Sequence, residues 1–137
     1  MSEETVAQKI SSLQRCVSQA RLALSTAGSE FKTNHLLQDA AVLNIIRACE
    51  TALDLANMLI RKRRLGIPSE SRESFGILVR EQLLDRSLGD KLQKMVGFRN
   101  LAVHRYQDLD LDIVAAVIRK TLDDLLDFAN VVHKHLN

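Results

Sequence analysis

The stretch from Thr33 to Arg64 carries two neighbouring apolar stripes at the spacing of an α-helix. One stripe consists of Leu37, Ala41, Ile45, Ala48, Ala52, Leu55 and Leu59. The other consists of Val42, Ile46, Cys49, Leu53, Ala56 and Ile60. A helix on a protein surface needs only one such stripe. Two stripes predict a helix buried on two sides, either at the centre of a bundle or against a second copy of the chain.

The rest of the sequence also has the patterns of helices. Apolar residues at helical spacing and capping signals predict helices over 5–27, 33–64 and 70–84, a fourth from a capping box at Ser87 and Asp90, and a last one that starts within 108–112. Thr33 or Asn34 caps the long helix at its start. Gly66 is the expected C-cap at its end, ahead of Pro68.

Composition agrees with an all-α fold. Aromatic residues make up 4% of the chain and tryptophan is absent, whereas the strands of β-sandwiches and barrels are enriched in aromatic residues. We therefore expect residues 1–137 to form a single all-α domain, an antiparallel bundle of four to five helices. Cys16 and Cys49 lie among apolar residues and are interpreted as small core residues. No leader or membrane-spanning run is recognisable, so the cytoplasm is the expected location, without membrane association.

Charge is distributed unevenly along the chain. The segment from Arg61 to Arg105 holds eleven Lys and Arg against five Asp and Glu, a net charge of +6, while the remainder is −4. This polarity suggests an anionic partner on one side, although solvated helix faces explain it equally well. A polar line on the long helix is interpreted as a solvated face with ion pairs within the helix. It consists of Arg47, Glu50, Asp54, Asn57 and Arg61.

Residues suited to chemistry gather in the run from Gly97 to Tyr106. It contains Arg99, Asn100, His104, Arg105 and Tyr106, the only tyrosine of the chain. On an ideal helix Tyr106 shares a face with Arg99, while His104 points about 140° away. Convergence on one ligand therefore requires the helix to loosen near Val103 or His104, or a second copy of the chain to complete the site.

These residue types suit the chemistry of phosphates. A histidine at a helix C-terminus titrates near neutrality and is able to transfer protons. An adjacent arginine offers a fixed fork of donors to a phosphate. A capping histidine with arginines lying along the surface is the structural alternative. No compact set of metal ligands is present, so neither a metal site nor a cofactor is expected.

The pattern Arg99-x4-His104-x-Tyr106, with Asn100 after the arginine, resembles the signature of HepT-like toxins in the HEPN superfamily. The segments Gln38-Asp39-Ala40-Ala41-Val42-Leu43-Asn44 and Arg47-Ala48-Cys49-Glu50 are also similar to that group. The resemblance implies a metal-independent ribonuclease that acts on RNA such as tRNA or mRNA. It also implies a homodimer whose two motifs meet in a cleft, and an MntA-like nucleotidyltransferase antitoxin that adenylylates the motif tyrosine, here Tyr106.

Under this hypothesis His104 acts as general base or acid, and Arg99 stabilises the charge that develops on the phosphorus. Asn100 binds the phosphate or orients His104. Backbone contacts to RNA come from Arg105, Arg61, Lys62, Arg63 and Arg64. The principal alternative is a non-catalytic helical module that binds nucleotides or a partner protein with the same residues. A purely structural bundle would leave the cluster from Arg99 to Tyr106 without a role.

Overall fold

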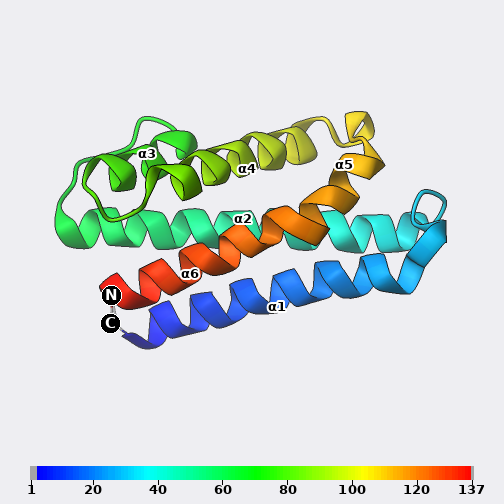
Figure 1. Ribbon diagram of the computed structural model, residues 1–137, viewed down its shortest axis with the longest axis horizontal. Helices are drawn as coiled ribbons and strands as arrows, with labels where there is room; N and C mark the ends of the chain where they lie inside the picture. Colours follow the sequence, from blue (N-terminus) through cyan, green and yellow to red (C-terminus); the bar gives the residue numbers. More distant parts are fainter. Residues whose placement is uncertain (1–2, 137) are drawn as a thin grey trace.

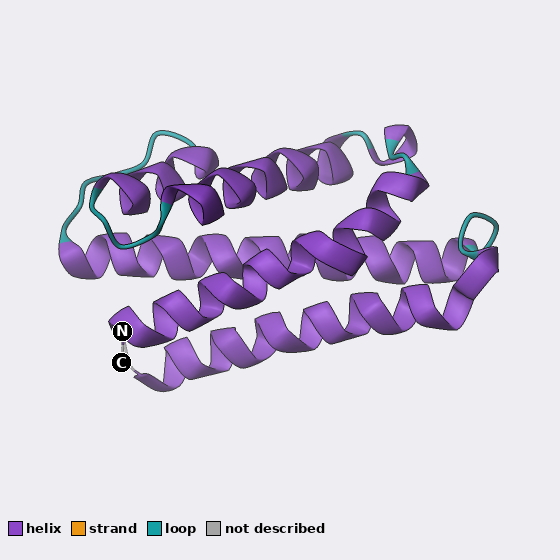
Figure 2. Cartoon of the chain, in the orientation of Figure 1, coloured by secondary structure: helices purple, strands orange, loops and turns teal. Residues whose placement is uncertain are grey.

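The computed structural model describes residues 3–136, which form helices and no strands (Figures 1 and 2). The α-helices are α1 Glu3–Ala27, α2 His35–Arg63, α3 Ser71–Arg80, α4 Arg86–His104, α5 Leu111–Ala116 and α6 Leu122–Leu136. Two short 3₁₀ turns, Gly28–Glu30 and Tyr106–Asp108, lie in the connections, and a π-helical turn, Val117–Thr121, joins α5 to α6. The all-α prediction is confirmed. None of these helices is long and apolar enough to cross a lipid bilayer.

Helix α2 lies at the centre of the bundle. It contacts α1 and α6 on one side and α3 and α4 on the other, and Figure 1 shows it between these two pairs. Its two apolar stripes are buried within the one chain: Ile45 and Leu59 are fully buried, and Ile60 is 1% exposed. Of the two explanations for a doubly apolar helix, the central position in the bundle is therefore sufficient.

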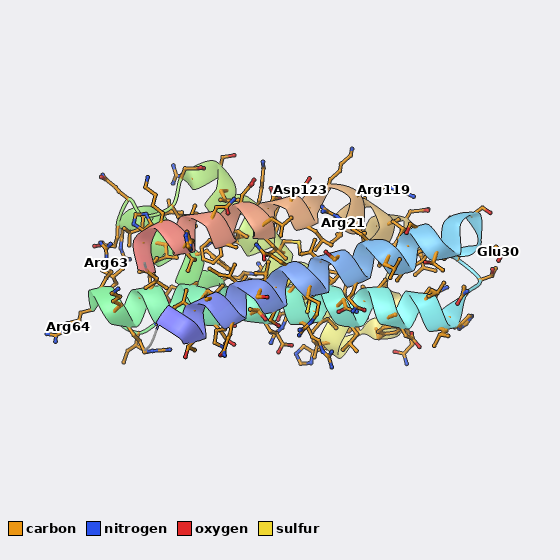
Figure 3. All side chains as sticks on the ribbon, turned by 90° about the horizontal axis from the view of Figure 1, so that it is seen from below. Arg21, Glu30, Arg63, Arg64, Arg119 and Asp123 are labelled. Atoms are coloured by element: carbon orange, nitrogen blue, oxygen red, sulfur yellow. The ribbon has the colours of Figure 1, made fainter. Side chains whose placement is uncertain are left out.

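Side chains from every α-helix contribute to one apolar core. Phe75 of α3 and Phe128 of α6 meet edge to face, with ring centroids 5.3 Å apart and an interplanar angle of 83°. Such a pair adds about 0.5–1.5 kcal/mol beyond the burial of its area. Cys16 and Cys49 are buried and unpaired, which confirms their interpretation as core residues. At the surface Arg21 of α1 pairs with Asp123 of α6 at 2.6 Å (Figure 3).

Two helices end at non-glycine residues in the left-handed conformation. Arg64 (φ 54°) terminates α2, and Gln82 (φ 61°) follows the end of α3. In each case the next residue, Leu65 or Leu83, donates its backbone N–H back into the last turn and packs its side chain on the core. The expected cap at Gly66 and the expected extension of α3 to Leu84 are therefore wrong, because burial of the following leucine fixes each helix end.

Helix starts are set by side chains that accept backbone hydrogen bonds. Asn34, one of the two expected caps of α2, accepts from Leu37 N at 3.0 Å. Helix α4 is capped by Asp85, which accepts from Leu88 N at 2.8 Å, so the predicted capping box at Ser87 is wrong. Leu84 is buried directly before the cap, and this burial places the start of α4 two residues earlier than expected.

The last predicted helix is interrupted by the π-helical turn. A π turn accommodates an additional residue within a helix and shifts the side chains that follow it. Val117 and Ile118 within the turn, and Leu122 directly after it, are all buried. In a regular α-helix these neighbouring side chains would point in different directions. The π-helical turn thus lets all of them reach the core.

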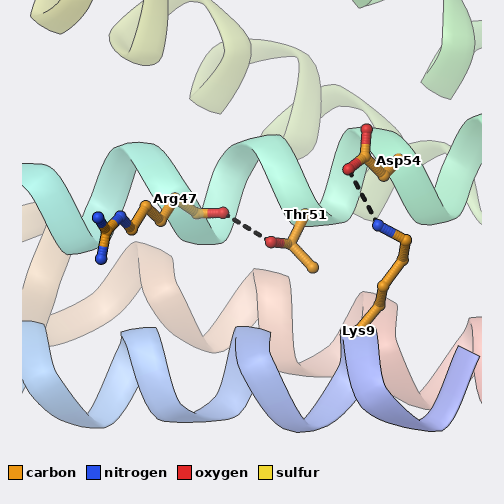
Figure 4. A network of polar contacts seen from close by, with 4 residues as sticks. All are labelled: Lys9, Arg47, Thr51 and Asp54. Atoms are coloured by element: carbon orange, nitrogen blue, oxygen red, sulfur yellow. Dashed lines mark hydrogen bonds and ion pairs between the residues drawn. The ribbon is translucent and has the colours of Figure 1, made fainter. Parts of the chain in front are cut away.

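The polar line on α2 binds other helices. Asp54 pairs with Lys9 of α1 at 3.3 Å (Figure 4), and Asn57 accepts a hydrogen bond from Ser74 of α3 at 2.7 Å. Glu50 lies 3.8 Å from Arg99 of α4. The interpretation as ion pairs within the helix is therefore wrong for these residues. Because α2 is the central helix of the bundle, partners on α1, α3 and α4 lie within reach of these side chains.

Candidate active site

Helix α4 ends within the run from Gly97 to Tyr106, directly after His104. Arg105 N donates to Leu101 O at 2.8 Å, and the backbone of Arg105 then leaves the helix (φ −140°, ψ 52°). Tyr106 begins the following 3₁₀ turn. Helix α4 thus stays regular through Val103 and His104, where loosening was expected, and breaks one residue later, so the break redirects Tyr106 but not His104. The shared face of Arg99 and Tyr106, which holds only on a continuous helix, does not exist.

Arg99 lies between α4 and α2 with 24% of its side chain exposed. Its Nη1 donates to Asn100 Oδ1 at 2.8 Å, and its Nε lies 3.8 Å from Glu50 Oε1, too far for a hydrogen bond. Within residues 3–136 the buried Nε has no hydrogen-bond acceptor. A buried donor without an acceptor costs about 1–3 kcal/mol, and more when charged. The guanidinium is therefore held in place while its buried Nε stays without an acceptor.

Asn100 follows Arg99 on α4, and His104 lies four positions beyond Asn100. Because Asn100 Oδ1 accepts from Arg99, its side chain orients Arg99, and the expected contact with His104 is not formed. His104 is the last residue of α4 and its side chain is exposed. This spacing of four positions is about one helical turn, so the side chains of Asn100 and His104 share a face. The imidazole stands at the C-terminus of α4.

Tyr106 is tied to the start of α2. Its hydroxyl donates a hydrogen bond to Asp39 Oδ1, across 67 positions of sequence. Partial burial, and then the hydrogen bond and negative charge of Asp39, raise the pKa of the phenol to about 12. The side chain is nevertheless 40% exposed. At neutral pH the hydroxyl is therefore protonated, anchored to a carboxylate and accessible from outside.

The raised pKa of Tyr106 predicts a measurable titration. Tyr106 is the only tyrosine and the chain lacks tryptophan, so near-ultraviolet absorbance reports its ionisation alone. We expect a midpoint near pH 12 in the folded protein and a lower one in Asp39→Asn, which loses the carboxylate charge. Because the folded-state pKa is raised, the stabilisation by neutral phenol is complete below about pH 10 and is lost between pH 10 and 12.

The matched control for this titration is Asp54→Asn, which removes a carboxylate from α2 that pairs with Lys9. Circular dichroism at each pH establishes that the chain is still helical. Equal midpoints in Asp39→Asn and the unaltered protein would show that the Asp39 carboxylate does not act on Tyr106.

The remaining basic candidates lie in two places. Arg105 pairs with Asp108 at 2.8 Å beside the end of α4. The basic run Arg61–Arg64 lies at the C-terminal end of α2, and Figure 3 places Arg63 and Arg64 at the opposite end of the molecule from Glu30. Asp39 and Arg63 are 24 residues apart on one helix, about 36 Å at 1.5 Å per residue. The structure therefore brings Arg105 to the candidate site and leaves the basic run outside it.

Asp39 and Glu50 belong to the site although no role was expected for either. Both lie in the two segments of α2 that carry the resemblance, which was the available signal. Helix α4 runs antiparallel to α2, so Arg99 meets Glu50 and Tyr106 meets Asp39. Glu50 also lines a groove of about 420 Å³ between α1 and α2, beside Arg15 and Arg47. Figure 4 shows Arg47 on this side of α2, where its carbonyl accepts from Thr51 at 2.8 Å.

Cys49 is buried in the core, close enough to Arg99 for the charge of the guanidinium to act on its thiol. Burial raises the pKa of its thiol to about 12, although the positive charge of Arg99 acts in the opposite direction. The thiol is therefore neutral and unsuited to act as a nucleophile. Across residues 3–136 no three His, Cys, Asp or Glu side chains are grouped closely enough to hold a metal ion.

Sequence and structure comparisons identify relatives over nearly the whole chain. The chain is 42% identical over 129 residues to the mRNA nuclease HepT of Shewanella oneidensis, covering 94% of this chain and 96% of that protein. A solved structure of a tri-AMPylated Shewanella oneidensis HEPN toxin in complex with MNT antitoxin superposes with a TM-score of 0.90 at 40% identity, covering 98% and 99% of the two chains.

The same fold recurs in YutE, a cytosolic protein of unknown function from Bacillus subtilis. Its TM-score is 0.83 at 18% identity, with 98% of this chain and 90% of that chain covered, and at this identity the likeness concerns the fold alone. The family model described as ribonuclease HepT-like matches residues 9–132. The match includes all six α-helices at least in part and the complete run from Arg99 to Tyr106. The chain therefore belongs to the HepT-like ribonuclease family.

Proposed function

We propose that this ribonuclease is the toxin of a toxin–antitoxin pair and cleaves RNA without a metal ion, using Arg99 and His104. The observation that carries the proposal is the Arg99 guanidinium, which is fixed by Asn100 and Glu50 and keeps one buried donor without an acceptor. Because 24% of the side chain is exposed, the outer part of the same guanidinium is open to an anionic phosphate oxygen. The similarity to the mRNA nuclease HepT supports messenger RNA as the substrate class and the cytoplasm as the compartment.

In the proposed reaction the ribose 2′-oxygen attacks the adjacent phosphorus and the 5′-oxygen leaves, which gives a 2′,3′-cyclic phosphate and a 5′-hydroxyl. His104 takes the proton from the 2′-hydroxyl or gives one to the leaving 5′-oxygen. Its exposed imidazole at the helix end is accessible to both oxygens. Arg99 stabilises the additional negative charge on the phosphorane oxygens, and Asn100 keeps the guanidinium oriented.

We also propose that two chains form the cleft. Arg99 and His104 diverge by about 140° around α4, so a second motif would provide the missing group at each phosphate. Exposed apolar side chains on α2 within four positions of Asp39, and in the last turn of α4, are the expected contact surface: Leu36, Leu43, Leu101 and Val103, exposed by 79%, 46%, 38% and 46%. Exposed apolar side chains that lie together often belong to a surface that binds another protein.

The dimer is tested by light scattering. Leu43→Glu places a charge in the patch and is expected to give monomers without cleavage activity. The matched control is Leu22→Glu on α1, because Leu22 is also exposed, by 63%, but lies far from the motif in sequence. A stable, active monomer of the unaltered protein at micromolar concentration would exclude a shared cleft.

The proposed partner is an MntA-like nucleotidyltransferase that adenylylates Tyr106. The complex of a tri-AMPylated HEPN toxin with MNT antitoxin supports this partner. Tyr106 fits the role of acceptor, because the residue is 40% exposed and its hydroxyl is hydrogen-bonded to the carboxylate of Asp39. The RNA-binding role of Arg105 and of Arg61, Lys62, Arg63 and Arg64 remains part of the proposal, the last four as contacts to RNA beyond the cleft.

The experiment that tests the function is incubation of the purified protein with total RNA in EDTA. Discrete cleavage products that disappear with His104→Ala support the nuclease mechanism. Binding of RNA without cleavage would support the alternative, a non-catalytic nucleotide-binding or partner-binding module.

A further inference from the structure

Gly97 accommodates an arginine from another helix. Arg72, in the first turn of α3, lies so close to Gly97 of α4 that a Cβ atom there would come within 2.4 Å of Nη2 and 3.4 Å of Cζ of Arg72. Glycine inside a helix costs about 0.5–1 kcal/mol relative to alanine. Because Gly97 has no side chain, the guanidinium of Arg72 packs against the backbone of α4.

The guanidinium of Arg72 lies on the face of α4 that leads to His104. Gly97, Asn100 and His104 follow one another at intervals of three and four residues, so their positions align on one side of the helix. Arg72 and Asn100 line the same pocket of about 410 Å³, together with Glu70 and Ser71. Asn100 in turn holds Arg99. Arg72 therefore stands next to the residues that orient the candidate catalytic arginine.

The charge of Arg72 is not neutralised by an ion pair. Within the described chain its side chain forms neither an ion pair nor a hydrogen bond, and only its backbone carbonyl accepts a bond, from Gln93 at 3.1 Å. The acidic residues near Arg72 are Glu70, the N-cap of α3, which lines the same pocket, and Glu73 and Asp90, which line a neighbouring groove with Arg72. Glu73 already accepts hydrogen bonds from Ser69. The donors of Arg72 are therefore available to an anion in this pocket.

We propose that Arg72 is a second phosphate-binding arginine of the active site and holds the RNA phosphate next to the one that is cleaved. Gly97 and His104 are seven residues apart on α4, about 10 Å along the axis. The guanidinium of Arg72 beside Gly97 therefore contacts the RNA backbone about 10 Å along α4 from the phosphate at His104. This inference rests on the proposed nuclease function and adds a substrate-binding residue to it.

The test compares three variants. Arg72→Gln removes the guanidinium. Gly97→Ala keeps the charge but displaces the group, since the flexible end of Arg72 yields to a methyl group without disruption of the fold. Arg80→Gln is the matched control, because Arg80 also lies on α3, is 66% exposed and carries the same charge. Thermal unfolding by circular dichroism establishes that all three are folded.

Binding of single-stranded RNA is measured in the His104→Ala background at several salt concentrations, and kcat/KM is measured in the active background. We expect Arg72→Gln to weaken binding about tenfold, the loss of one charge-assisted contact. The slope of log affinity against log salt falls in magnitude by about 0.7, the value for one phosphate on a single strand. Gly97→Ala should change affinity in the same direction, and Arg80→Gln by less than twofold.

Equal effects of Arg72→Gln and Arg80→Gln, in a protein that cleaves RNA, would overturn this inference and leave the proposed function intact. An unchanged affinity in Gly97→Ala would also overturn it, since the effect of Arg72 would then be general charge and not position. An unaltered protein that neither binds nor cleaves RNA would overturn the proposed function itself, and this inference with it.

Discussion

His104→Ala is expected to reduce RNA cleavage by about 100- to 10,000-fold, the range that general acid–base groups contribute. The imidazole is exposed at the end of α4, so its removal creates no cavity and the melting temperature should change little. Cleavage of a defined RNA oligonucleotide in EDTA gives the rate. His133→Ala on α6 is the control, because it removes another exposed histidine outside the motif.

Arg99→Ala should reduce cleavage to a similar extent but for a different reason. The guanidinium is mostly buried between Glu50 and Asn100, so alanine also removes structural contacts. Arg99→Lys separates the two effects: a lysine retains the charge beside Glu50 but lacks the planar fork of donors. We expect Arg99→Lys to fold normally and to cleave poorly. A wild-type rate in His104→Ala would contradict the mechanism, whatever the result with Arg99.

The bundle was predictable because its main determinant is local periodicity. Apolar residues at helical spacing located the helices, and the two stripes of α2 indicated burial on two sides. The ends of the helices were harder to predict from the sequence. Arg64 and Gln82 adopt the left-handed conformation that usually signals glycine, because the leucine after each of them is drawn into the core. That preference arises from tertiary packing, which a capping signal in a single sequence does not contain.

The residues of the motif were predictable, but their surroundings were not. A straight helix cannot direct Arg99 and His104 to one point, and α4 stays helical through both residues and breaks only at Arg105. The partners of Arg99 and Tyr106 lie 49 and 67 positions away on α2. Such contacts depend on the antiparallel register of α4 against α2. The proximity of Arg72 to Gly97 has the same origin, since α3 and α4 pack side by side.

The local setting of Tyr106 bears on how an adenylyl group would be attached. In the proposed modification the phenol oxygen attacks the α-phosphorus of ATP and pyrophosphate leaves, so the hydroxyl must lose its proton. With a pKa near 12 the phenol does not ionise by itself at neutral pH. The carboxylate of Asp39 already accepts the hydrogen bond from this hydroxyl and is positioned to accept the proton. The attached group would then add bulk and negative charge beside the motif.

Co-expression with a cognate nucleotidyltransferase is therefore expected to add AMP to Tyr106 and to abolish RNA cleavage, because the adenylate competes with substrate phosphate for Arg99. Tyr106→Phe should cleave RNA at a rate near that of the unmodified protein, gain no AMP and stay toxic in the presence of the partner. Intact-mass and peptide spectra locate the modification, and growth assays measure neutralisation. AMP found on another residue, or neutralisation of Tyr106→Phe by binding alone, would refute control through Tyr106 while leaving the assignment of Arg99 and His104 untouched.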